Sequence, residues 1–185
     1  MASKVRKRHL MAHEEHRRRA PNQLKVGLLT VSTSKFLQKS RKDNRVRDES
    51  GDAAERTIKR AGHDIVSRKL LNDDLWSIRL ELLKALFEDK ADVVLIMGGT
   101  GISQRDVTIE AVIPLITKEI EGFGEIFRNI TYDKIGSPAM LTRAIGGIID
   151  KGKLVFCLPG SPDAVKTALD LLTPDLPHAF IISSS

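Results

Sequence analysis

Three glycines and an aspartate give the first chemical signal in this sequence. Gly98, Gly99 and Gly101 surround Thr100 directly after an apolar stretch, and Asp106 follows five residues later. Glycine accepts positive φ angles and lets backbone N–H groups approach a ligand, so such a loop is typical of anion binding. The loop is neither a Walker A motif nor a Gly-x-Gly-x-x-Gly motif. It indicates phosphate binding, with a tight strand-to-helix turn as the structural alternative.

Two other segments carry residues of the same chemical kind. Pro159, Gly160 and Ser161 form a second glycine-containing loop, and Asp73 begins a predicted helix. A carboxylate near phosphates can hold Mg²⁺, but an aspartate at a helix start also complements the helix dipole. Ser161 precedes Pro162 and has the form of an N-cap. The roles of Asp73 and Ser161 therefore stay open between function and capping.

The elements that must position these loops alternate between strands and helices. Apolar stretches predict buried strands, and apolar residues at three- and four-residue spacing predict helices. We expect strands at 24–32, 64–71 and 91–97, a β-hairpin at 144–149 and 153–158, and helices at 51–61, 73–88, 108–118, 121–132 and 162–172. Asn72 is expected to cap the second helix. Residues 33–50 are expected to form a long mobile loop, and the Ser-rich end of the chain a frayed tail.

This alternation predicts a three-layer α/β/α fold with a mainly parallel sheet and a β-hairpin. Ligands of such sheets bind at the carboxyl ends of the strands. Two of the predicted strands end in glycine-containing loops, at 98–101 and at 159–162. We therefore expect both loops to lie at the same edge of the sheet.

The composition is that of one globular domain. A chain of 185 residues with 41% hydrophobic residues suits a single core. Cys157 is the single cysteine, which rules out an intramolecular disulfide or a cysteine-based metal site and fits a reducing cytoplasm. No stretch reaches the roughly 18 apolar residues that cross a bilayer, and no signal peptide is recognisable. We expect a cytoplasmic protein that does not span a membrane.

The net charge of +6 belongs to the first part of the chain. Residues 1–25 hold eight Lys/Arg and two Glu, whereas the remaining residues hold 22 Lys/Arg and 22 Asp/Glu. Residues 1–23 are rich in charge and poor in apolar side chains, so we expect a flexible basic arm there and a folded domain at 24–185. A neutral body with 4% aromatic residues disfavours a nucleic-acid-binding module. The role of the arm is left open.

Five motifs in a fixed order extend the signal of the glycine loop. They are Gly98-Gly99-Thr100-Gly101, Arg105-Asp106-Val107-Thr108, Gly122-Phe123-Gly124-Glu125-Ile126-Phe127-Arg128, Ser137-Pro138-Ala139-Met140-Leu141-Thr142-Arg143-Ala144 and Leu158-Pro159-Gly160-Ser161-Pro162. In this order and spacing they resemble the MoaB/MogA molybdopterin-binding family, which includes the pterin-adenylylating domain of gephyrin. The resemblance runs from about Lys25 to Leu172.

The resemblance implies a compact α/β/α domain that assembles into a homotrimer or a homohexamer. It also implies transfer of AMP from ATP to the terminal phosphate of molybdopterin, with Mg²⁺ and with release of pyrophosphate, in molybdenum or tungsten cofactor biosynthesis. Asp73 and Asp106 match the family's catalytic aspartates, and Asp106 its Mg²⁺ ligand. The binding residues implied in the same way are Gly98, Gly99, Thr100, Gly101, Ser137, Arg143, Pro159, Gly160 and Ser161.

A molybdopterin carrier or scaffold without turnover is the alternative function. Asn72 stands where some active members have proline, and residues 33–50 do not align with the family, whereas Asp73 and Asp106 favour catalysis. The sequence leaves open whether molybdenum or tungsten is the eventual metal and whether the assembly is a trimer or a hexamer. It also leaves open whether other proteins of cofactor biosynthesis bind.

Overall fold

The central sheet is mainly parallel. The computed structural model describes residues 20–40 and 46–185, and within them six strands form one sheet in the order β2-β1-β3-β6-β5-β4. The strands are β1 (Lys25–Val31), β2 (Asp64–Leu71), β3 (Val93–Met97), β4 (Lys118–Glu119), β5 (Ile145–Asp150) and β6 (Lys153–Leu158). β1 pairs in parallel with β2 and β3, and β3 with β6, whereas β5 is antiparallel to β6 and β4. The parallel sheet with a hairpin is confirmed.

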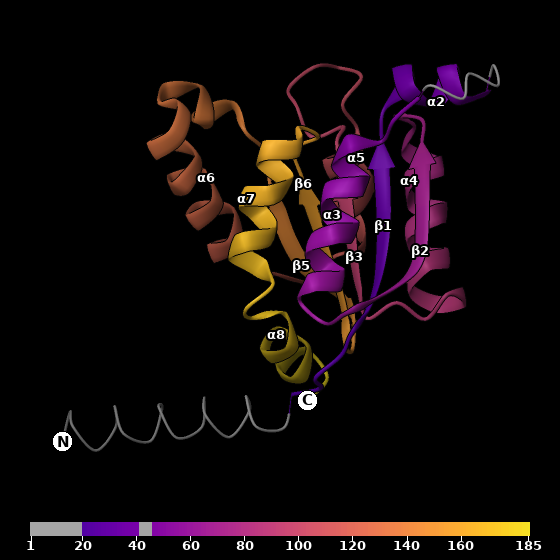
Figure 1. The fold of residues 1–185 in the computed structure, drawn as a ribbon, viewed down its shortest axis with the longest axis vertical. Helices are drawn as coiled ribbons and strands as arrows, with labels where there is room; N and C mark the ends of the chain where they lie inside the picture. The colour runs from indigo at the N-terminus through magenta and orange to yellow at the C-terminus, as the bar shows by residue number, and fades with distance from the viewer. Residues whose placement is uncertain (1–19, 41–45) are drawn as a thin grey trace.

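Helices cover both faces of this sheet (Figure 1). One apolar core joins the sheet to α3 (Glu49–Arg60), α6 (Glu121–Ile135), α7 (Pro162–Leu172) and α8 (Leu176–Ser183). A second core joins it to α4 (Leu75–Leu83), to the π-helical continuation η1 (Lys84–Glu88) and to α5 (Thr108–Val112). In β3, Leu95 and Met97 enter the first core, while Val94 and Ile96 enter the second. A strand buried on both faces is therefore continuously apolar, and the three-layer prediction is confirmed.

Two segments that were expected to be irregular contain helices. Residues 33–50 include α2 (Thr33–Ser40) and the first two residues of α3, and the C-terminal tail contains α8. No residue of α2 is buried, which explains why its sequence lacks the apolar spacing that predicts a helix. α8 is anchored because Leu176 is buried and because Gly152 N–H donates to Ser183 O at 3.0 Å. Residues 41–45, and most of the predicted arm at 1–23, lie outside the described residues.

The predicted helix at 108–118 is shorter than expected. α5 ends at Val112, a 3₁₀ turn η2 (Ile113–Leu115) follows, and the chain then forms β4. Pro114 disfavours a continued α-helix because proline lacks the backbone N–H that would donate to the carbonyl four residues earlier. Beyond it, the N–H groups of Thr117 and Ile120 donate to the carbonyls of Ile148 and Gly146, each at 2.7 Å. Pairing with β5 thus replaces the last predicted helical turn.

The cap of α4 differs from the sequence-based expectation. Asp74, rather than Asn72, is the N-cap, and its Oδ1 accepts a hydrogen bond from Ser77 N at 2.8 Å. Asn72 Oδ1 is buried and has no hydrogen-bond partner among the described residues. Because Asp74 performs the capping, the carboxylate of Asp73 does not serve as the cap of this helix.

In the part of the chain that the structure describes, no helix has both the length and the apolar character to cross a bilayer.

Candidate active site

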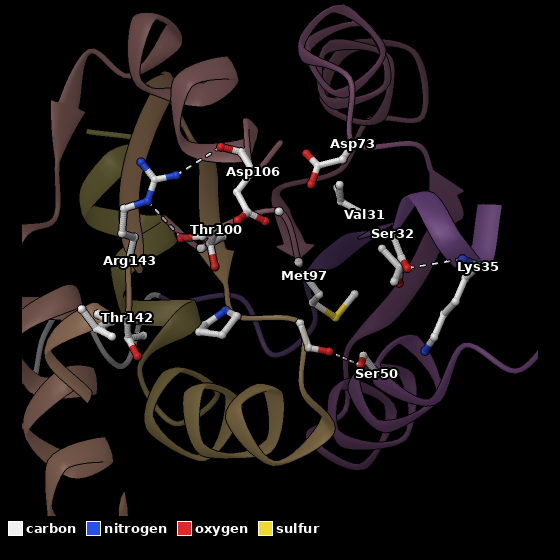
Figure 2. A pocket seen from close by; sticks show the side chains of 17 residues that line it. Val31, Ser32, Lys35, Ser50, Asp73, Met97, Thr100, Asp106, Thr142 and Arg143 are labelled. Carbon is white, nitrogen blue, oxygen red and sulfur yellow. Dashed lines mark hydrogen bonds between the residues drawn. The ribbon is translucent and has the colours of Figure 1, made fainter. Parts of the chain in front are cut away.

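The two glycine-containing loops meet at the carboxyl edge of the sheet. Gly98 follows β3, Gly160 follows β6, and Gly98 N–H donates to Leu158 O at 2.9 Å. A Cβ placed on Gly160 would lie 3.0 Å from Gly98 Cα. The predicted shared edge is therefore confirmed. A cavity of about 480 Å³ opens there; besides both loops, its walls include the last residues of β1 (Figure 2).

The conformation of the glycine loop explains why glycine is needed. Gly98 has a φ of +101° and Gly99 a φ of +63°, which disfavours other residues at both positions. A Cβ on Gly98 would lie 2.2 Å from Val31 O, and one on Gly99 would lie 2.4 Å from Thr108 Oγ1. The chain therefore has no room for side chains here. The loop passes close to both β1 and the start of α5.

Thr108 is hydrogen-bonded to the glycine loop through both its side chain and its backbone. Its side chain is fully buried, and its Oγ1 donates to Gly98 O at 2.8 Å. Its backbone N–H donates to Gly99 O at 2.9 Å. One residue thus satisfies two loop carbonyls and ties the loop to the start of α5.

The two predicted aspartates lie against this same loop. A Cβ on Gly99 would be 2.8 Å from Asp73 Oδ1, and one on Gly101 would be 2.6 Å from Asp106 Oδ2. Both carboxylates line the cavity (Figure 2). Asp73 Oδ1 accepts from Val107 N at 3.2 Å, and Asp106 Oδ2 accepts from Ser103 N at 3.0 Å.

The surroundings of Asp73 favour its protonated form more than water does. Burial raises its pKa above the ordinary value, and the negative charges of Asp106 and Glu110 add to this, while the hydrogen bond from Val107 opposes it. Carboxylates that repel one another in this way are characteristic of sites that accept a cation.

The carboxylates present fit Mg²⁺ shared with a substrate. Among the described residues no group of three or more His, Cys, Asp or Glu could hold a metal ion. Mg²⁺ is commonly bound by one or two carboxylates together with substrate phosphates and water. Asp73 and Asp106 supply that number of carboxylates, so they suit a Mg²⁺ ion that arrives with a phosphate-bearing substrate.

Arg143 lines the cavity, but its guanidinium is already engaged. Nε donates to Thr100 O at 3.0 Å, and Nη2 donates to Asp106 O at 3.3 Å. The same group forms an ion pair with Glu110 of α5. Arg143 therefore braces the loop segments on either side of Asp106, and these bonds compete with any phosphate for its N–H groups.

Ser137 and Ser161 are not among the residues that line this cavity. Ser161 caps α7, since its Oγ accepts from Ala164 N at 3.2 Å. Ser137 is exposed and begins the 3₁₀ turn η3 (Ser137–Leu141), whose last residue, Leu141, does line the cavity. The other predicted residues, Gly98, Gly99, Thr100, Gly101, Asp73, Asp106, Arg143, Pro159 and Gly160, come together in it.

A further wall of the cavity, provided by β1 and by the starts of α2 and α3, was not predicted from the sequence. Thr30, Ser32, Lys35 and Ser50 line the cavity from this side. Ser50 is buried, and its Oγ donates to Gly160 O at 2.6 Å. One signal was present: β1 is a parallel strand too, so its carboxyl end had to reach the same edge.

Comparisons with known proteins agree with this geometry. The family model described as "Probable molybdopterin binding domain" matches residues 27–178. The chain is 44% identical over 170 residues to molybdenum cofactor biosynthesis protein B of Bacillus cereus, covering 91% of this chain and 95% of that protein. It is 41% identical over 174 residues to molybdopterin adenylyltransferase of Pyrococcus furiosus, covering 91% and 96%.

Solved structures show the same similarity in three dimensions. A crystal structure of molybdenum cofactor biosynthesis protein B matches with a TM-score of 0.78 and 43% identity, over 89% of this chain and 98% of that one. The tungsten cofactor synthesizing protein MoaB from Pyrococcus furiosus matches with a TM-score of 0.76 and 39% identity, over 90% and 100%.

Proposed function

Because the chain belongs to the family of probable molybdopterin-binding domains, we propose that it is a molybdopterin adenylyltransferase of molybdenum or tungsten cofactor biosynthesis. In this reaction an oxygen of the terminal phosphate of molybdopterin attacks the α-phosphorus of ATP. A P–O bond forms there, the bond from the α-phosphorus to the bridging oxygen breaks, and pyrophosphate leaves with the electron pair. Relatives named for this activity and for cofactor biosynthesis, which align with 91% of the chain, support the proposal.

The observation that carries the proposal is the pair of aspartates on one glycine loop. A molybdopterin carrier needs contacts to the pterin and its phosphate, but has no use for two carboxylates that repel both one another and that phosphate. Asp73 approaches the loop from the segment between β2 and α4, Asp106 approaches it from the segment before α5, and both line the cavity. Such an arrangement becomes favourable when a cation joins the carboxylates to phosphates.

The remaining walls suit the other demands of the reaction. We propose that the 98–101 loop and Gly160 lie against phosphate groups, because their glycines allow close approach of the ligand to the backbone. Bound Mg²⁺ would be held by Asp106, with Asp73 as its neighbour, and would neutralise negative charge on the reacting phosphates. Arg143 would keep the backbone around Asp106 in position through its bonds to Thr100 O and Asp106 O.

We further propose that the protein acts as a cytoplasmic homo-oligomer, a trimer or a hexamer. The outer face of α4 and η1 supports the assembly, because Trp76, Leu80, Leu83 and Phe87 lie there at helical spacing and are exposed, Trp76 by 71%. Exposed apolar stripes of this kind commonly mark contacts between subunits. The reduced, fully buried Cys157 is compatible with a reducing compartment.

The test is turnover with defined substrates. The purified protein is incubated with molybdopterin, ATP and Mg²⁺, the pterin is separated by chromatography, and pyrophosphate release is measured in parallel. Adenylylated molybdopterin and pyrophosphate in equal amounts, both dependent on molybdopterin, are expected. Binding of molybdopterin with neither product would establish the carrier function instead.

A further inference from the structure

The charged side chains that line the cavity are not paired with one another. Asp73 and Asp106 bring two carboxylates to one wall, and the guanidinium of Arg143 is engaged by backbone carbonyls and by Glu110. Lys35 also lines the cavity. Within the described residues its ammonium has neither an ion pair nor a side-chain hydrogen bond, unlike Lys59, Lys69 and Lys84, which pair with carboxylates.

The position of Lys35 separates it from the aspartates. It lies in the first turn of α2, directly after β1, and its side chain runs along the wall toward Ser50 (Figure 2). Asp73 and Asp106 lie on the other side of the cavity in the same view. Ser32 Oγ supports the turn by accepting from Lys35 N at 3.5 Å and lies 3.3 Å from Ser34 Oγ. The wall thus carries a cation and hydroxyl groups but no carboxylate that lines the cavity.

This distribution of charge has a consequence for polyanionic substrates. A phosphate near Asp73 and Asp106 is attracted only when a metal ion lies between the phosphate and the carboxylates. A phosphate near Lys35 is attracted directly by the positive charge of the ammonium group. Lys35 is half-buried, and an ammonium group forms charge-assisted hydrogen bonds to phosphate oxygens that are stronger than neutral ones. A substrate with several phosphates is therefore attracted directly by Lys35 and, through a metal ion, by Asp73 and Asp106.

We propose that Lys35 binds a substrate phosphate on the wall opposite the aspartates. The proposal rests on the adenylyltransferase function and deepens it, because it assigns a phosphate contact to a residue outside the glycine loops. The phosphate can belong to ATP or to molybdopterin, and binding measurements with each ligand distinguish the two sources.

The test compares three variants by calorimetry. Lys35→Met removes the charge and keeps an unbranched apolar chain, while Lys35→Arg keeps a charge that can reach a phosphate. Lys39→Met is the matched control, because Lys39 lies one turn further along α2, is exposed and does not line the cavity. The titrants are ATP with Mg²⁺, pyrophosphate, molybdopterin and adenosine, the last of which has no phosphate.

We expect Lys35→Met to lower the affinity for at least one phosphate-bearing ligand by about tenfold or more, and tenfold corresponds to about 1.4 kcal/mol of binding free energy. Adenosine affinity should not change, Lys35→Arg should restore most of the loss, and Lys39→Met should bind like the parent. A loss confined to ATP and pyrophosphate assigns the nucleotide phosphates, and a loss confined to molybdopterin assigns its phosphate. The proposal would be overturned if the affinities of Lys35→Met for all phosphate ligands stayed within threefold of the parent's. It would also be overturned if the affinity for adenosine fell by as much as that for the phosphate ligands.

These measurements are independent of turnover. If the parent binds ATP or molybdopterin but releases no pyrophosphate, the adenylyltransferase function fails while the affinities of the Lys35 variants still decide the role of Lys35. If the parent binds none of the phosphate ligands, both proposals fail.

Discussion

Asp73 accepts a hydrogen bond from the backbone N–H of Val107, the residue that follows Asp106, at 3.2 Å. This bond joins the end of β2 to the segment before α5 and brings together two carboxylates that are 33 positions apart in the chain. The side chain of Asp73 therefore has a positional role in addition to its charge. Asp73→Asn keeps an oxygen that can accept this bond, whereas Asp73→Ala does not.

For Asp73 we expect the two variants to differ. Asp73→Asn should retain the parent's thermal stability but lose turnover, because the charge that would attract Mg²⁺ is gone while the bond to Val107 remains. Asp73→Ala should in addition lose about 1–3 kcal/mol of unfolding free energy, since a partly buried N–H is left without its partner. Thermal unfolding and pyrophosphate release measure the two effects separately. Equal stability of the two variants would show that the bond contributes nothing.

Gly99→Ala is expected to abolish binding of phosphate ligands. The residue has a φ of +63°, and the added Cβ would lie 2.4 Å from Thr108 Oγ1 and 2.8 Å from Asp73 Oδ1, so the loop must move away from both. Gly62→Ala is the matched control, because Gly62 also has positive φ, at +88°, but a Cβ there meets nothing within 4 Å. Calorimetry with ATP and molybdopterin should show normal affinity in the control. Parent-like affinity of a folded Gly99→Ala variant would remove the loop from the site.

Glu110→Gln separates the two possible roles of Arg143. If Arg143 braces the loop, weakening its ion pair lets the backbone around Thr100 and Asp106 shift, and turnover should fall several-fold with a small loss of stability. If Arg143 instead binds phosphate, the loss of a competing carboxylate should strengthen phosphate binding. We expect the first result, and a rise in pyrophosphate affinity would contradict it.

The buried His63 makes stability fall in acid. His63 is 3% exposed, and its Nδ1 accepts from Leu24 N at 3.3 Å, which requires the neutral ring. Burial lowers its pKa from the ordinary 6.5. The unfolded chain therefore gains a proton first as the pH falls, so this contribution is complete above about pH 6.5 and is lost below it. The free energy of unfolding should decrease from pH 7.5 to pH 5.5 by more in the parent than in His63→Gln; equal decreases would exclude His63 as the cause.

Local sequence patterns predicted the parts of the molecule in which neighbouring residues decide the structure. The continuous apolar residues of β3 predicted a strand buried on both faces, and the order of strands and helices predicted that Gly98 and Gly160 would share an edge. α2 and β4 were missed for different reasons. α2 buries no side chain and so leaves no apolar spacing, and β4 exists because Thr117 and Ile120 find partners on β5, which are distant in sequence.

Sequence motifs predicted some of the residues that line the cavity. Those that only the topology of the sheet brings there were missed. Glycines and aspartates of the loop were recognisable, but Lys35 and Ser50 enter the cavity because β1 ends beside β3. Ser161 is the reverse case, in which the sequence left binding and capping open. Its Oγ accepts from the first turn of α7, and Ser161 is not among the residues that line the cavity.

Turnover by Asp106→Asn tests the proposed adenylyl transfer most directly. The substitution removes one charge and keeps size, so folding and molybdopterin binding should survive; Asp89→Asn, an exposed aspartate outside the cavity, is the control. We expect AMP transfer to fall about a hundredfold or more, because a carboxylate that positions Mg²⁺ contributes several kcal/mol to the transition state. Transfer within about threefold of an active parent, less than about 1 kcal/mol of barrier, would contradict the role of Asp106 and the mechanism built on it.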